Sequence, residues 1–245
     1  MDLEQKEAIE INNWNISQYE SPDTFSMQSI LYKLSEARVF WHKVEKYNHI
    51  FEQGHTILEI GAGQGWAGSF LKQKYRDKQI YISDISSYAI QVSSHWETFL
   101  SILLDKKMVC KSYAIPLEDD SVDTVFCYAS AHHFVEHEKT LKEVYRVLKK
   151  GGHCVYLHEP SCRKYIYPLA HWRVNKKRPA VPEDVLVYKG IMQLGKKVGF
   201  SENSFVFDPI IVNREPFELI YYYLLQKISF LKYILPCTVD YILKK

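Results

Sequence analysis

The period of the apolar positions changes near residue 56. From Met27 to Phe51, apolar side chains recur every three or four residues, which is the spacing of one helical face, and Gly54 is a stop signal. Residues 1–25 are polar with scattered aromatic rings and show no such period. We therefore expect an irregular arm followed by one long helix.

Downstream, short apolar runs alternate with longer segments of helical period. The runs predict strands over residues 57–60, 80–82, 108–110, 124–128 and 154–157. The clearest helical period between them covers residues 141–148 and ends before two glycines. Strands and helices in alternation imply right-handed crossovers, and so predict an α/β fold with a mainly parallel sheet in three layers. Ligands of such sheets bind beyond the carboxyl ends of the strands.

The last third of the chain has a different composition and a different pattern of apolar residues. Residues 159–182 are basic and aromatic, and the pattern then predicts a helix over 184–198 and a strand over 203–208. The apolar tail that follows is interrupted by Lys227 and Lys232, which argues against a membrane-spanning helix. We expect a helical tail that packs on the domain, with peripheral membrane contact or a homodimer as alternatives.

Composition narrows the class of protein. Apolar residues make up 47% and charged residues 24% of the chain, as in ordinary globular proteins. A net charge of +2 gives no reason to expect a nucleic-acid partner. Five cysteines without paired spacing predict free thiols rather than disulfides or a metal site. Because no apolar run follows a basic start, we expect a cytoplasmic location, with association at a membrane surface as the alternative.

A glycine-rich turn follows the first predicted strand. In Glu59-Ile-Gly61-Ala-Gly63-Gln-Gly65-Trp66 a strand runs through glycines into a helix, so backbone can approach a nucleotide-like ligand closely. Counted from Gly63, the glycines fit a dinucleotide fingerprint. Counted from the strand end at Gly61, the third glycine position falls on Trp66, which disfavours a pyrophosphate site.

Asp84 ends the second predicted strand, about twenty residues after the glycine turn. Its carboxylate can accept hydrogen bonds from both ribose hydroxyls of an adenosine, and such charge-assisted bonds are strong. The plainer alternative is that Asp84 only helps to cap the next helix, which begins near Ser86.

The ordered motifs resemble those of a known family. Glu59-Ile-Gly61-Ala-Gly63 resembles motif I of class I S-adenosylmethionine-dependent methyltransferases, and the segments 110–126, 131–134 and 143–152 are similar to the type 11 group. The resemblance covers about residues 56–158 and implies a Rossmann-like fold with a seven-stranded or six-stranded sheet. It also implies S-adenosylmethionine as cofactor and S-adenosylhomocysteine as its product. One departure is Ser112, where the family often has an acid near the adenine amino group.

The resemblance assigns site residues and an organisation to the chain. Residues 1–53 are expected to cap the cofactor site, 54–210 to form the core with a lid at 159–182, and 211–245 to form the apolar helical tail, all in one structural domain. The residues expected to bind the cofactor are Glu59, Gly61, Ala62, Gly63, Gln64, Gly65, Trp66, Asp84, Ile85, Ser112, Tyr113, Ala114, Tyr128 and Ala129.

Methyl transfer is an in-line displacement, so the acceptor must be held against the methyl group, and a hydroxyl acceptor also needs a base. His133 is the first choice for that base, with His158 and Glu159 as second choices, and we expect no metal. The residues expected to contact the acceptor are Tyr19, His132, Arg163, Tyr165, Trp172 and Arg173. The alternative for the lid is a solvated basic loop.

The sequence thus predicts a methyltransferase that acts on a small-molecule or glycan-like acceptor, with transfer to oxygen. An NAD(P)-dependent oxidoreductase is a second hypothesis, but it requires a substrate domain that the remaining length hardly supplies. A non-catalytic protein that binds S-adenosylmethionine is a third.

Overall fold

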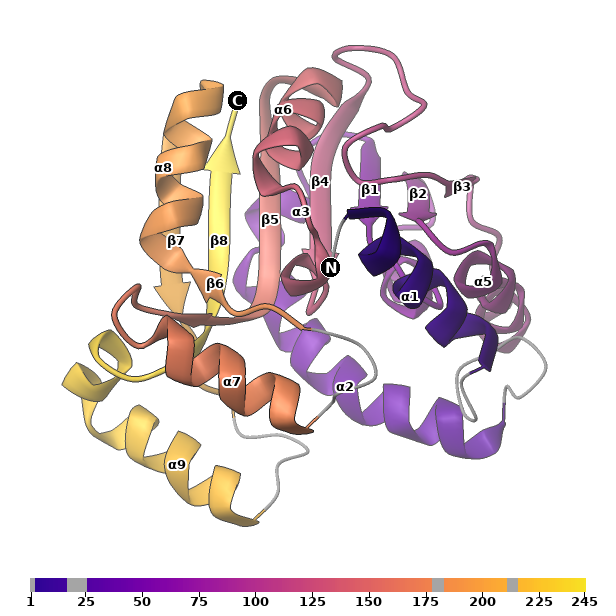
Figure 1. Ribbon diagram of the computed structural model, residues 1–245. Coiled ribbons are helices and arrows are strands. Elements are labelled where there is room, and N and C mark those ends of the chain that lie inside the picture. Colours follow the sequence, from indigo (N-terminus) through magenta and orange to yellow (C-terminus); the bar gives the residue numbers. More distant parts are fainter. Residues whose placement is uncertain (1–2, 17–25, 178–182, 211–215) are drawn as a thin grey trace.

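The computed structural model describes residues 3–16, 26–177, 183–210 and 216–245 (Figure 1). The strands are β1 (Thr56–Ile60), β2 (Gln79–Asp84), β3 (Lys106–Val109), β4 (Val122–Tyr128), β5 (Leu148–Cys162), β6 (Leu186–Val187), β7 (Glu202–Phe207) and β8 (Cys237–Lys244). They form one sheet in the order β3-β2-β1-β4-β5-β8-β7, with the two-residue β6 beside β5. The strands β1 to β6 pair in parallel, whereas β8 runs antiparallel to both β5 and β7.

Helices cover both faces of the sheet and the carboxyl ends of its parallel strands. One face carries α2 (Met27–Lys46), α3 (Asn48–Phe51), α4 (Trp66–Lys74) and α5 (Ser87–Leu100), and the other carries α6 (His137–Val147) and α8 (Tyr188–Val198). Three further helices, α1 (Leu3–Ile16), α7 (Tyr167–Lys177) and α9 (Pro216–Lys227), lie toward the carboxyl ends of the strands (Figure 1).

Successive residues of the central strands supply two separate cores. Ile57 and Phe126 are fully buried against α2 to α5, while their neighbours Leu58 and Val125 are fully buried against α6 and α8. A strand buried on both faces has no polar side, which is why these segments are continuous apolar runs in the sequence. The α/β fold with helices on both faces is confirmed, and β6 adds a strand to the six or seven expected.

Two expectations about the ends of the chain are wrong. Residues 3–16 form the helix α1 rather than an irregular arm, and residues 17–25 lie outside the described part. The tail is helical in α9, but residues 237–244 are the strand β8, which lies between β5 and β7 in the sheet. The tail's abundance of apolar residues hid this change of period, because Val239, Tyr241 and Leu243 alternate with other residues as in a strand.

A buried ion cluster joins α2 to β8. The Nζ of Lys43, which is fully buried, donates to Asp208 and to the fully buried Asp240, at 2.7 Å in each case. The hydroxyl of Tyr47 donates to the other carboxylate oxygen of Asp240 at 2.9 Å. Asp240 also accepts the backbone N–H of His158 at 3.0 Å. Because a buried charge that loses its partner is costly, this cluster fixes α2 over the carboxyl ends of the strands.

Candidate active site

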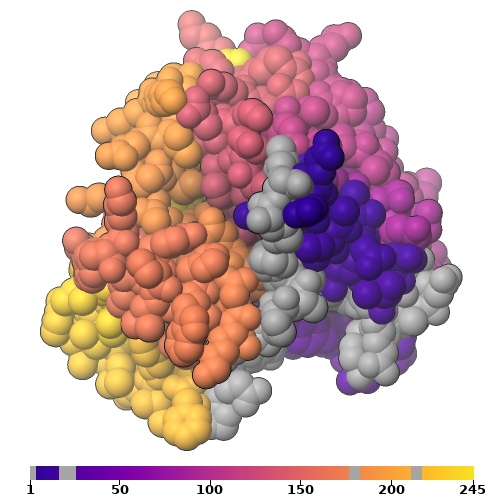
Figure 2. Space-filling model, viewed as in Figure 1, coloured from indigo at the N-terminus to yellow at the C-terminus, as the bar shows by residue number. Residues whose placement is uncertain are grey.

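A cavity of about 1380 Å³ lies at the carboxyl ends of β1, β2, β4 and β5. Residues of α1, α2 and α7 complete its walls. On the face shown in Figure 2, α1 lies on one side and α7 with α9 on the other. The cavity exceeds the usual size of a site for one small ligand, so it has room for a cofactor and an acceptor together.

The glycine turn lies at one end of this cavity. Gly63 has a φ of 53°, and a Cβ built on it would lie 2.9 Å from the ring of Trp14. Gly65 has a φ of 70° and immediately precedes α4. Both positions therefore require glycine, because L side chains rarely adopt this conformation. Because Gly61 and Gly63 line the cavity, the turn presents backbone rather than side chains to a ligand, which is the property expected of a cofactor site.

Asp84 points at that turn. One of its carboxylate oxygens accepts the backbone N–H of Gly63 at 2.8 Å, and the other accepts the N–H of Ser86 at 2.9 Å. Ser86 itself caps α5 through the N–H of Ala89. Burial raises the pKa of Asp84 to about 6, although the two backbone hydrogen bonds oppose the shift. The carboxylate thus supports the helix start and also lines the cavity.

Most of the residues predicted to bind the cofactor line the cavity. They are Gly61, Ala62, Gly63, Gln64, Trp66, Asp84, Ile85, Ser112, Tyr113, Tyr128 and Ala129. Glu59, Gly65 and Ala114 are not among the lining residues. Glu59 lies beneath the turn, where it accepts the N–H of Gly68 at 2.8 Å. Burial raises the pKa of Glu59 to about 8, and the charge of Asp84 adds to the shift.

Glu159 lies beneath the end of the cavity opposite the glycine turn, where it binds the backbone of residues 130–132. One carboxylate oxygen accepts the N–H groups of Ser130 and Ala131, both at 2.9 Å. The other accepts the N–H of His132 at 3.2 Å and lies 2.9 Å from Nδ1 of the same residue. Burial opposes ionisation of Glu159, yet these partners hold its pKa below the ordinary value. Glu159 does not line the cavity, so we correct its expected role from catalytic to positioning.

The three histidines of this end lie at the cavity wall. His132 is largely buried, and its ring centre lies 4.2 Å from that of His133. Nδ1 of His133 is 3.5 Å from a carboxylate oxygen of Glu10 in α1. Burial disfavours the charged form of His133, but Glu10 outweighs it and raises the pKa of the imidazole. His158 occupies a bulge of β5 with a φ of 62° and stacks on Tyr128.

Only some of the residues that were predicted to contact the acceptor line the cavity. His132 and Arg173 line the cavity, whereas Arg163, Tyr165 and Trp172 do not, and Tyr19 lies outside the described residues. Arg163 and Tyr165 instead donate to the backbone carbonyls of Tyr233 and Ile234. Trp172 is 58% exposed and, being the adjacent residue of the helix, points to a different side of α7 from Arg173. The lid contributes one helical face to the site rather than all of its basic and aromatic residues.

Several residues of the cavity wall were missed from the sequence. In α1, Glu7, Glu10 and Trp14 line the cavity, and their spacing of three and four residues was a usable signal of a common helical face. Glu7 pairs with Lys111 at 2.7 Å and accepts the hydroxyl of Tyr113, which ties α1 to the loop after β3. Glu183 was also missed, and no local pattern pointed to it.

Comparisons with known proteins agree with this geometry. Residues 58–156 match the family profile of the type 11 methyltransferase domain. An uncharacterised methyltransferase-like protein of Schizosaccharomyces pombe is 34% identical over 108 residues, which cover 42% of this chain and 38% of that protein. A malonyl-[acyl-carrier protein] O-methyltransferase of Marinomonas is 30% identical over 104 residues, with 42% and 38% covered. The chain thus spans less than half the length of these relatives.

Solved structures share the fold at low identity. The geranyl diphosphate C-methyltransferase of Streptomyces coelicolor superposes with a TM-score of 0.67 at 14% identity, over 93% of this chain and 84% of that one. A methyltransferase of Archaeoglobus fulgidus gives 0.57 at 16%, over 85% and 94%. The glycine turn, the carboxylate beside it and these matches define a class I S-adenosylmethionine-dependent methyltransferase domain. Within that class, residues 58–156 of this chain resemble the type 11 methyltransferase domain.

Two further expectations concern the whole chain. All five cysteines are free thiols, as their spacing predicted. Among the residues that the structure describes, no helix combines the length and the apolar character needed to cross a membrane.

Proposed function

We propose that this protein transfers the methyl group of S-adenosylmethionine to an oxygen of a small-molecule acceptor. The observation that carries the proposal is the carboxylate of Asp84 held against the glycine turn by the N–H of Gly63 at 2.8 Å. A carboxylate in that place can accept both ribose hydroxyls, while the turn accommodates the amino-acid end of the cofactor. When bound, S-adenosylmethionine supplies a methyl group that is attacked by a nucleophile in line with the departing sulfur.

The other end of the cavity suits a hydroxyl acceptor. If Nδ1–H of His132 donates to the ionised Glu159, Nε2 is left as the unprotonated nitrogen that can accept a proton. We therefore assign the base to His132 in place of His133, whose raised pKa favours the protonated form. On transfer of the methyl group to the acceptor oxygen, the hydroxyl proton would pass to Nε2 of His132.

The acceptor itself is proposed only by class. A cavity of about 1380 Å³ leaves room for a small organic molecule or a saccharide beside the cofactor, and Arg173 can pair with an anionic group on it. Among the relatives, one is named a malonyl-[acyl-carrier protein] O-methyltransferase, and a structural neighbour is named a geranyl diphosphate C-methyltransferase. The malonyl group carries a carboxylate and geranyl diphosphate carries phosphates, and a cationic side chain at the cavity wall suits an anionic acceptor of this kind.

One experiment tests the proposal against its two rivals. S-adenosylhomocysteine and NAD are titrated separately into the protein by calorimetry, and methyl transfer from labelled S-adenosylmethionine is then followed with a panel of small carboxylic acids, phenols and saccharides. We expect heat of binding with S-adenosylhomocysteine alone and label in at least one acceptor. Binding of NAD would support the oxidoreductase, and cofactor binding without label in any acceptor would support the non-catalytic protein.

An exposed apolar surface favours a second proposal, that the protein associates with anionic membrane surfaces. In α9 and the turn after it, Phe217 is 87% and Phe230 61% exposed, and Lys227 and Lys232 lie among them. Aromatic side chains beside lysines suit the interface of a membrane. Flotation with phosphatidylserine vesicles should carry the protein upward, and Phe217→Ser with Phe230→Ser should abolish this. Sedimentation of the wild-type protein without the vesicles would refute the association.

A further inference from the structure

Imidazole and carboxylate groups converge at the acceptor end of the cavity. One ring nitrogen of His132, one of His133 and one carboxylate oxygen of Glu183 lie within 4.8 Å of one another. All three residues line the cavity, so a ligand can reach them. These are the donor types that bind divalent transition metals, although the sequence pattern predicted no metal. The prediction missed the group because Glu183 is far from the histidines in the sequence.

Glu159 orients His132, which is one of the two histidines of this group. Nδ1 of His132 lies 2.9 Å from Glu159, which also accepts three backbone N–H groups of the same turn. A histidine whose one nitrogen is held by a carboxylate presents the other nitrogen in a fixed direction. This carboxylate–histidine pair is the arrangement that supports metal ligands in proteins. His132 is thus prepared to ligate through Nε2.

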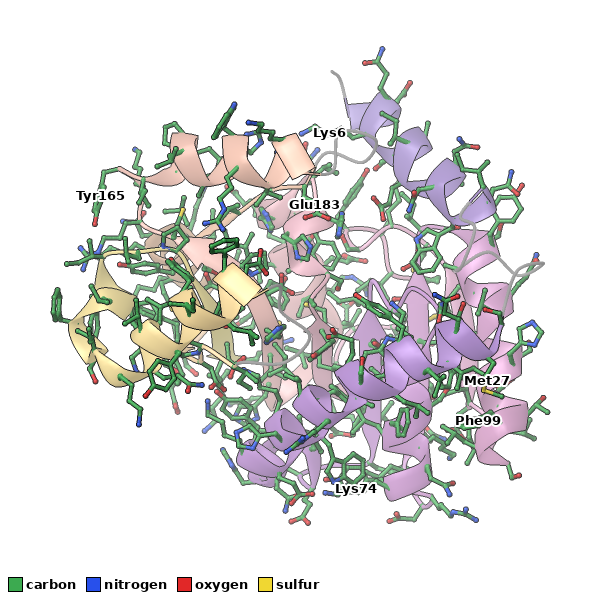
Figure 3. The ribbon with its side chains drawn as sticks, turned by 90° about the horizontal axis from the view of Figure 1, so that it is seen from below. Lys6, Met27, Lys74, Phe99, Tyr165 and Glu183 are labelled. Atoms are coloured by element: carbon green, nitrogen blue, oxygen red, sulfur yellow. The ribbon has the colours of Figure 1, made fainter. Side chains whose placement is uncertain are left out.

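Glu183 is fixed from two sides. Its backbone carbonyl accepts the amide of Asn175 at 2.9 Å, and its N–H donates to the same side chain at 3.1 Å, which attaches it to α7. The N–H of Asp184 donates to the carbonyl of His132 at 3.1 Å, which attaches it to the histidine turn. Figure 3 shows Glu183 between α7 and α1. The backbone of Glu183 is therefore fixed from both sides, which places its side chain beside the imidazoles.

The surrounding charge favours a cation. Glu10, Glu159 and Glu183 all act electrostatically on His133, and Asp184 and Glu159 act on the neighbouring His137. With neutral imidazoles, these carboxylates leave an excess of negative charge at this end of the cavity. A divalent ion offsets that charge more completely than a single protonated histidine does.

We propose that His132, His133 and Glu183 form a binding site for a divalent transition-metal ion of the zinc type. Two nitrogens and one oxygen suit such an ion, whereas Mg²⁺ and Ca²⁺ require mostly oxygen ligands. At metal–ligand distances of about 2.0–2.2 Å, two donors of a tetrahedral site lie about 3.4 Å apart, so the three side chains would draw together by up to about 1.4 Å when the ion binds. Three protein ligands leave a fourth position open to the cavity.

The use of this ion rests on the proposed function. An acceptor oxygen that occupies the fourth position is held near the cofactor, and the ion lowers the pKa of an acceptor hydroxyl directly. In that state His132 serves as a ligand, and the ion takes over the activation of the hydroxyl from the imidazole. Metal binding can nevertheless be measured in the absence of cofactor and acceptor, so the two proposals fail independently.

A cobalt titration tests the site. Protein stripped with a chelator is titrated with Co²⁺, and the visible d–d absorption is recorded, followed by displacement with Zn²⁺. We expect saturation at one equivalent and loss of the band on addition of Zn²⁺. His132→Ala, His133→Ala and Glu183→Gln should each weaken Co²⁺ binding at least about tenfold. The matched controls His42→Ala and Glu202→Gln change exposed residues outside the cavity and should bind Co²⁺ as the wild type does.

Calorimetry with S-adenosylhomocysteine checks that each variant remains folded. Glu183→Gln keeps the shape of the side chain, so its affinity for S-adenosylhomocysteine should match that of the wild type. Absence of a d–d band in the wild-type protein overturns the proposal, and so does wild-type Co²⁺ affinity in both His133→Ala and Glu183→Gln. Loss of cobalt binding together with unchanged binding of S-adenosylhomocysteine supports it.

Discussion

The two ends of the cavity are built in different ways. The cofactor end comes from neighbouring turns of parallel strands, where Gly63 and Asp84 lie within one βαβ unit and are joined by a single hydrogen bond of 2.8 Å. The acceptor end gathers His132, Glu159 and Glu183, which come from three separate segments. A local motif therefore builds the first end, and tertiary packing builds the second. In such a chain the sequence alone indicates the class of cofactor, whereas the residues of the acceptor site become apparent only from the fold.

A substitution in the buried ion cluster that joins α2 to β8 should have the largest effect on stability. Lys43→Met leaves Asp240 buried without its main partner, so we expect the free energy of unfolding to fall by about 3–5 kcal/mol in urea titrations. Lys46→Met removes a more exposed lysine from the same cluster and should cost about 1 kcal/mol or less. Equal losses in the two variants would show that the cluster does not join α2 to β8 in the way described.

A substitution of Glu159 should impair the acceptor end of the cavity and leave the cofactor end unchanged. Glu159→Gln cannot accept all the hydrogen bonds that the ionised carboxylate receives from residues 130–132, so the histidine turn should lose its fixed orientation. We expect kcat to fall about a hundredfold, as for the loss of an oriented general base, in steady-state assays. Affinity for S-adenosylhomocysteine should change by less than about twofold, since Glu159 does not line the cavity. A parallel loss of cofactor affinity would mean that the two ends are not separable.

The cofactor end should respond to pH through Asp84. Its pKa of about 6 lies above that of a free carboxyl, so ionised Asp84 destabilises the ligand-free fold above that pH, and protonation removes the cost as the pH falls. Charge-assisted bonds to ribose require the ionised form. Affinity for S-adenosylhomocysteine should therefore drop about tenfold between pH 7 and pH 5 in calorimetric titrations. A flat profile in the wild type would contradict this role.

The contact of α1 with the cofactor end should have the smallest effect. Glu7→Gln removes the ion pair with Lys111, which is worth about 1 kcal/mol or less at an exposed partner. The association rate of S-adenosylhomocysteine, followed by stopped-flow tryptophan fluorescence, should rise by less than about fivefold. Glu4→Gln, an exposed change on the same helix, should leave the rate unaltered. A slower association in Glu7→Gln would refute α1 as a cover of the site.

The contrast also explains what could be predicted. Gly61, Gly63 and Asp84 were found because they lie at or just after the end of a strand in a pattern with a fixed order, and the mainly parallel sheet followed from the alternation of periods. The helix α1 was missed because its inward face is polar, so it has no apolar period. The strand β8 was missed because its two-residue period lies within a tail that is apolar throughout.

The residues of the acceptor end were harder to predict from the sequence, for a different reason. Glu159 lies within β5, and only the fold reveals that its side chain faces the turn beneath the cavity. Glu183 reaches the site through a backbone hydrogen bond between Asp184 and His132, which no sequence period encodes. On α7, the basic and aromatic residues were treated as one lid, although a helix presents Arg173 and Trp172 to different sides.

We infer that Asp84 holds the sugar of S-adenosylmethionine beside the glycine turn. Calorimetric titration of S-adenosylhomocysteine at pH 7.5 into the wild type, Asp84→Asn and the exposed control Asp119→Asn tests it most directly. Loss of hydrogen bonds to a charged group should weaken binding about tenfold to a hundredfold in Asp84→Asn, with Asp119→Asn unchanged. Wild-type affinity in Asp84→Asn would contradict the account.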